Sequence, residues 1–132
     1  MNLYILLLGR KVSENIIQRR SYQEGDYIFR EGDQGTTAFG VQSGEVEIFT
    51  SRDGEETILG TFKENDIFGE MGLIVGQPRM ASARCTKNSS IIVISNGEFE
   101  QRLEKIDPFV RGLIKLMIHH IRENFKDYQR KY

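Results

Sequence analysis

Glu70 and Arg79 are the two residues whose chemistry and spacing best suggest a binding site. The arginine offers a fixed positive charge and a planar fork of N–H donors that suits a phosphate. The glutamate would accept hydrogen bonds from the hydroxyl groups of a sugar. Gly69 and a short apolar turn flank the glutamate, a pattern that predicts a helical turn whose first N–H groups favour an anion. A simpler alternative stays open at this point, namely a Glu70–Arg79 salt bridge that closes a loop.

The other chemically active side chains form no recognisable catalytic or metal-binding pattern. His119 and His120 are the only histidines. As neighbours on a predicted helix, they would point in different directions and could not chelate one metal together. Cys85 is the single cysteine, which excludes an internal disulfide and a cysteine-based zinc site. No Ser/His/Asp or Cys/His arrangement is visible. We therefore expect a protein that is not an enzyme and that holds no metal or cofactor.

Charge and hydropathy narrow the choice of partners. The 132 residues carry a net charge of −1, which provides no overall field for gripping nucleic acid. Residues 23–70 hold twelve acidic and three basic side chains, so an anion bound there needs a local cation. The apolar run at residues 3–8 is far shorter than the ~20 residues of a membrane span, and its positive charges follow it, unlike those of a secretory signal. We expect a cytoplasmic protein that contacts neither nucleic acid nor membrane through this segment.

The middle of the chain must position these residues with strands. Short β-rich pieces alternate with turns that contain glycine and aspartate, which favour tight reversals of the chain. Val46 and Ile48 alternate with polar neighbours, as in a half-buried strand. About seven strands are expected in an antiparallel sandwich or barrel, at residues 27–29, 38–41, 46–49, 57–59, 66–68, 83–85 and 91–94.

Both ends of the chain are predicted to be helical. Ser13 and Glu14 suggest the start of a short helix over residues 13–20. Residues 98–105 predict another helix, and Asp107 followed by Pro108 marks the start of an amphipathic helix of about twenty residues. That last helix either packs on its own domain, the default, or pairs with a second copy of itself. The expected organisation is an N-terminal helical segment at 1–21, a β domain at 22–95 and two C-terminal helices at 96–132.

The segment at residues 68–83, FGEMGLIVGQPRMASA, is a more specific indication of function than any single residue. It resembles, without a gap, the phosphate-binding cassette of the cyclic nucleotide-binding domain family. Residues 24–33, EGDYIFREGD, are similar to that family's early strands and turn, and residues 43–46 to the strand that follows. The resemblance covers roughly residues 12–130. It implies a mainly β fold with flanking helices, in which the strands form a double-stranded β-helix, the jelly-roll architecture also seen in cupins.

The resemblance also implies roles for individual residues. Arg79 would pair with the cyclic phosphate and Glu70 with the ribose 2′-hydroxyl. Backbone N–H groups would complete the cradle, and apolar residues would wall the sugar and base. The further residues so implicated are Gly69, Met71, Gly72 and Met80 in the cradle, Ala81 at its edge, Ile48, Leu59 and Gly60 in the wall, and Phe125 and Tyr128 as a candidate lid on the base.

Met80 departs from the family pattern and bears on the ligand. A hydroxyl at this position is associated with guanine recognition, and a thioether is a poor hydrogen-bond partner, which favours cAMP over cGMP. The resemblance predicts a non-catalytic sensor that closes its last helix over a bound cyclic nucleotide and signals through that movement. It would act on an effector domain or partner, or as a homodimer through the last helix. The competing hypothesis is an interaction or dimerisation module with a degenerate or differently liganded pocket.

Overall fold

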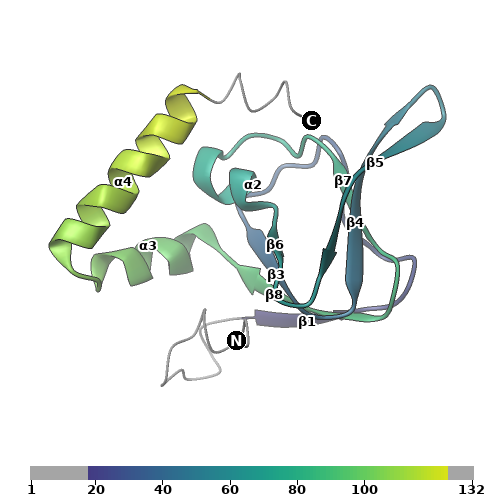
Figure 1. Cartoon of the computed structure of the whole chain (residues 1–132), viewed down its shortest axis with the longest axis horizontal. Coiled ribbons are helices and arrows are strands. Elements are labelled where there is room, and N and C mark those ends of the chain that lie inside the picture. The colour runs from purple at the N-terminus through teal and green to yellow at the C-terminus, as the bar shows by residue number, and fades with distance from the viewer. Residues whose placement is uncertain (1–17, 125–132) are drawn as a thin grey trace.

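The computed structural model describes residues 18–124, which fold into two facing antiparallel sheets with helices at one side (Figure 1). One sheet has the strand order β1-β8-β3-β6 and the other β2-β7-β4-β5. The mainly β architecture expected from the sequence is confirmed. The strands are β1 (Gln18–Tyr22), β2 (Tyr27–Phe29), β3 (Ala38–Ser43), β4 (Glu45–Arg52), β5 (Glu55–Lys63), β6 (Ile67–Phe68), β7 (Ser82–Cys85) and β8 (Ser89–Ile94), and the helices are α2 (Glu70–Val75), α3 (Asn96–Glu104) and α4 (Pro108–Glu123).

The core lies between the two sheets and continues into the wall of the site. Apolar side chains alternate along the strands, so each sheet turns one face inward. Phe68 is 1% exposed and stacks against Phe39, with ring centroids 5.4 Å apart. The aromatic cluster therefore holds β6 and the start of α2 against β3. The buried core residues are Phe39, Val41, Val46, Phe68, Ala83, Cys85, Ile91 and Val93.

The predicted N-terminal helix is wrong where the structure describes it. Gln18–Tyr22 forms a strand that pairs antiparallel with β8, from Gln18 opposite Val93 to Tyr22 opposite Ser89. A free edge of β8 offers backbone partners that a local helix-start signal does not reveal, and tertiary pairing overrides weak helix propensity. The β domain thus begins at residue 18 rather than 22. Residues 13–17 of the predicted helix lie outside the described residues.

Gly44 lets the chain cross from one sheet to the other. It follows β3 and precedes β4, and its φ of 99° lies in the left-handed region that favours glycine. A side chain would also collide with the backbone of Asn88 and Ser89, which pass close to its Cα. The predicted turn at residues 43–45 therefore needs glycine for two independent reasons.

The two C-terminal helices begin where the sequence suggested, within two residues. The Ser95 hydroxyl accepts a hydrogen bond from Glu98 N at the start of α3. Asp107 Oδ1 accepts from Phe109 N and Val110 N at the start of α4, at 3.0 and 3.2 Å. These contacts satisfy N–H groups that have no acceptor within their own helix.

Asp107→Ala should fray the start of α4. The helix has no fully buried residue among those described, so packing compensates little for a lost cap. We expect a loss of about 1 kcal/mol in the stability of the helix, visible as reduced helical signal in circular dichroism. Asp107→Asn, which retains a capping oxygen, is the control and should stay near wild type. Equal helicity in the alanine variant would show that the cap contributes nothing.

Candidate functional site

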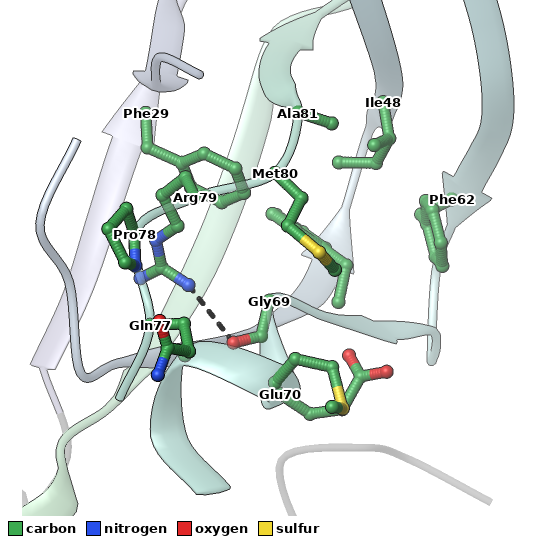
Figure 2. Close-up of a pocket in the computed structure, with 13 residues that line it drawn as sticks. Phe29, Ile48, Phe62, Gly69, Glu70, Gln77, Pro78, Arg79, Met80 and Ala81 are labelled. Carbon is green, nitrogen blue, oxygen red and sulfur yellow. Dashed lines mark hydrogen bonds between the residues drawn. The ribbon is translucent and has the colours of Figure 1, made fainter. Parts of the chain in front are cut away.

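A pocket opens between the inner face of the β domain and the first turn of α2 (Figure 2). Its volume is about 110 Å³, well beyond the roughly 10–15 Å³ that a single water needs on the same measure. A ligand-sized group can therefore enter it. The lining residues are Phe29, Ile48, Phe62, Phe68, Gly69, Glu70, Met71, Gly72, Gln77, Pro78, Arg79, Met80 and Ala81.

Arg79 is a buried cation to which no carboxylate of residues 18–124 is bonded. Only 7% of the residue is exposed. Its Nη1 donates to the Gly69 carbonyl at 3.0 Å, and its Nη2 donates to the carbonyl and hydroxyl of Thr37 at 2.8 and 3.0 Å. Nε has no partner in the part of the chain described. Figure 2 shows the guanidinium turned toward Gly69 at the amino end of α2.

Burial lowers the pKa of the Arg79 guanidinium from its ordinary value, and the negative charge of Asp33 offsets part of this effect. Arginine still keeps its proton at neutral pH. Aromatic rings lie beside the guanidinium, whose central carbon is 4.4 Å from the centroid of the Phe29 ring. A desolvated positive charge of this kind is costly unless an anion reaches it. An anion that entered the pocket would supply the negative charge that the described neighbours of Arg79 do not.

Glu70 lies at the first position of α2 and lines the same pocket. It is exposed and forms no ion pair with Arg79 within the described residues, so the salt-bridge alternative is wrong. Its carboxylate remains available as an acceptor. The structure thus brings the predicted acceptor and the predicted cation to one cavity without letting them neutralise each other.

Apolar side chains form the wall opposite the arginine. Ile48, Met80 and Ala81 line the pocket there, although only Ile48 was expected in the wall, and Met80 and Ala81 were expected in the cradle and at its edge. Figure 2 shows Met80 between Ala81 and Gly69. Sequence reasoning missed the aromatic contribution of Phe29, Phe62 and Phe68, together with Gln77 and Pro78. For Phe62, the available signal was the alternation of inward-facing and outward-facing residues along β5, the strand that pairs with β4.

Leu59 and Gly60 do not line this pocket, contrary to the sequence prediction. The register of β4 and β5 shifts between Ile48, which faces Gly60, and Phe49, which faces Ile58. Leu59 is the extra residue of this bulge. A Cβ atom built on Gly60 would lie 3.3 Å from the Phe62 ring, so this ring lies beside Gly60 at the wall of the pocket.

Nothing described from α4 lines the pocket, and the candidate lid residues Phe125 and Tyr128 lie outside the described residues. Residues 18–124 contain no group of three or more His, Cys, Asp or Glu side chains that could hold a metal ion. Over the same range, no helix is long and apolar enough to cross a membrane.

Comparison with known families decides what kind of domain this is. The family model of the cyclic nucleotide-binding domain matches residues 19–105. The chain belongs to the cyclic nucleotide-binding domain family. The match contains both sheets, the pocket and α3, and it confirms the resemblance carried by residues 68–83.

Curated relatives of this cyclic nucleotide-binding domain include a regulatory protein and a receptor protein. The anaerobic regulatory protein of Bacillus subtilis is 32% identical over 83% of this chain and 47% of its own length. The cyclic AMP receptor protein of Thermus thermophilus is 30% identical over 80% of this chain and 50% of its own length. The chain therefore spans about half the length of these relatives.

Among solved structures, the halfsite-occupied form of the EAL enzyme Bd1971 is similar to the cyclic nucleotide-binding domain described here. Its TM-score is 0.78 at 31% sequence identity, and the alignment covers 81% of this chain and 96% of that one. Agreement at this level supports the arrangement of the two sheets and of the pocket between them.

Proposed function

We propose that the pocket binds a 3′,5′-cyclic nucleotide, with the phosphate at Arg79 and the ribose hydroxyl at Glu70. The observation that carries this proposal is the buried Arg79 guanidinium, whose hydrogen-bond acceptors are all neutral. A cyclic phosphate supplies the missing negative charge, and the apolar wall shields the remainder of the ligand. In this proposal the domain itself binds and does not catalyse.

Isothermal titration of the purified chain tests the proposal. We expect saturable binding of cAMP, weaker binding of cGMP and little binding of 5′-AMP, whose open, more highly charged phosphate does not match a single cation. No heat with either cyclic nucleotide, on protein shown to be folded by circular dichroism, would refute the assignment.

The apolar character of the wall supports cAMP over cGMP. Among the described residues that line the pocket, none carries a hydroxyl group. Guanine carries a carbonyl oxygen and an amino group where adenine carries only an amino group, so guanine has one more exocyclic polar group that would lose water there, and a buried polar group without a partner is unfavourable. In this proposal Met80, next to Arg79, is the residue that discriminates between adenine and guanine.

Met80→Thr should therefore shift selectivity toward cGMP. One added hydrogen bond contributes about 1 kcal/mol, so the ratio of the cGMP to the cAMP dissociation constant should fall roughly fivefold. Met80→Leu, which keeps the size without a hydroxyl, is the matched control and should preserve the wild-type ratio. A ratio that does not move in the threonine variant would show that Met80 does not read the base.

We propose that occupancy is transmitted through the helices that follow the pocket. Arg122 Nε of α4 donates to the Ile74 carbonyl of α2 at 2.7 Å, and Asn96 Nδ2 of α3 donates to the Leu73 carbonyl at 3.3 Å. Both acceptors lie in the last turn of the helix that lines the ligand pocket. An open groove between α2, α3 and α4 leaves room for these helices to repack when α2 shifts.

The outer face of α4 favours a second function, self-association. The domain covers part of the apolar stripe of α4, since Ile114, Ile118 and Ile121 are half-buried. The adjoining side stays exposed, with Phe109 at 78%, Val110 at 44%, Leu113 at 48%, Leu116 at 64% and Met117 at 57%. Spacings of three and four residues let two copies of such a helix pack against each other. We propose a homodimer through this face.

A further inference from the structure

Arg79 is held in place by a segment outside residues 68–83. That segment is the connection between β2 and β3, residues 30–37. Arg79 N donates to the Asp33 carbonyl at 2.8 Å, and Gly32 N donates to the Arg79 carbonyl at 2.8 Å. The hydrogen bonds from Nη2 to Thr37 also hold the Arg79 side chain in place. Both the backbone and the guanidinium of Arg79 are thus positioned from this connection.

Gly35 lies where the guanidinium passes closest to the connection. A Cβ atom built on Gly35 would be 2.7 Å from both Nε and Nη2 of Arg79, closer than real Cβ contacts come. A Cβ atom on Gly72, in α2, would collide with Nη1 on the other side and lie 2.8 Å from the Gly35 carbonyl. The guanidinium therefore occupies a slot between the backbones of Gly35 and Gly72, neither of which carries a side chain.

Backbone conformation does not explain these two glycines. Neither Gly35 nor Gly72 has a φ in the left-handed region, so alanine could adopt either conformation. Glycine inside a helix is also unfavourable by up to ~1 kcal/mol relative to alanine, which makes Gly72 unexpected on local grounds. The reason that remains is space: for the Arg79 side chain at Gly35, and for both that side chain and the Gly35 carbonyl at Gly72.

The slot orients the charge without neutralising it. The acceptors that Arg79 uses are the carbonyls of Gly69 and Thr37 and the Thr37 hydroxyl, which are all uncharged. The nearest acidic residue of the connection, Asp33, uses its Oδ2 to accept from Arg30 N and close its own turn. The positive charge of the fixed fork is therefore left for an external anion.

We propose that Gly35 is a positioning residue of the anion site, and that the β2–β3 connection is a second arm of that site alongside residues 68–83. The proposal rests on the function proposed above for Arg79. It assigns Gly35 no contact with the ligand: the residue acts by leaving space for the guanidinium beside Thr37. Gly72 acts in the same way from α2, in addition to lining the pocket.

Gly35→Ala tests the proposal in two measurements. The added methyl group should displace the guanidinium, so we expect cAMP to bind roughly tenfold or more weakly in isothermal titration. The ligand-free variant should also unfold at lower urea concentration. Gly97→Ala is the matched control, because its Cβ would meet nothing within 4 Å and its φ is not left-handed. It should bind cAMP like the wild type and should not unfold at a lower urea concentration.

A double variant separates this clash from a general effect on folding. In an Arg79→Ala background the side chain that Gly35→Ala would strike is gone, so the urea midpoint should no longer fall when the methyl is added. Wild-type affinity and midpoint in Gly35→Ala would overturn the proposal, as would an equal loss of midpoint in both backgrounds. If wild-type protein binds neither cyclic nucleotide, the proposed function fails, while the urea comparison still decides whether Gly35 positions Arg79.

Discussion

Arg79→Ala should nearly abolish cyclic nucleotide binding, with the dissociation constant for cAMP rising at least ~30-fold. Removing one member of a buried charge pair leaves the other desolvated and unpaired, which costs about 2–5 kcal/mol, and ~2 kcal/mol corresponds to roughly thirtyfold. The acidic composition of residues 23–70 worsens the loss, because the surrounding field repels a phosphate once the cation is gone. Isothermal titration at constant ionic strength measures this change.

Two companions make the Arg79 result interpretable. Arg79→Lys keeps the charge but loses the planar fork that Gly69 and Thr37 orient, so it should bind with intermediate affinity. Arg52→Ala removes an arginine whose side chain is 69% exposed and pairs with Glu31 on the surface, and it should bind like the wild type. Retained affinity in a folded Arg79→Ala variant would mean that the phosphate lies elsewhere.

Leu116→Glu should convert a dimer into a monomer. Leu116 lies on the exposed apolar face of α4, with Leu113 and Met117 beside it along the helix. In a symmetric dimer the substitution acts twice, replacing two apolar contacts by two carboxylates that must lose water. An increase of the dimer dissociation constant by more than ~100-fold, or about 3 kcal/mol, follows from the usual value of a buried leucine on each side.

Light scattering coupled to size exclusion, over a range of protein concentrations, reads this outcome directly. Gln101→Glu adds the same charge at an exposed position of α3 and should leave the dimer intact. Because Leu116 is 64% exposed in the single chain, its replacement should not disturb the fold, which circular dichroism can verify. A wild-type chain that stays monomeric at high concentration would contradict the dimer.

Local patterns were sufficient for much of the fold. The strands from β2 to β8 lie where alternation and turn residues placed them, although β5 runs four residues beyond the predicted segment to Lys63. Asp107 caps α4 as its position before a proline indicated. These features depend on neighbours within a few residues, so a single stretch of sequence carries the signal. β1 was missed because its stabilising partner, β8, lies about seventy residues away.

The site shows the same division. Glu70 and Arg79 were predicted as site residues from the sequence because an arginine suits a phosphate, a carboxylate suits sugar hydroxyls, and the segment at residues 68–83 resembles the phosphate-binding cassette of the family. The tertiary structure decided that the two residues do not pair, that Phe62 rather than Leu59 lines the wall, and that Gly35 leaves space for a side chain 44 positions further along the chain. Residue types and periodicity indicate which groups are present, whereas the close approach of distant backbones exists only once the sheets have paired.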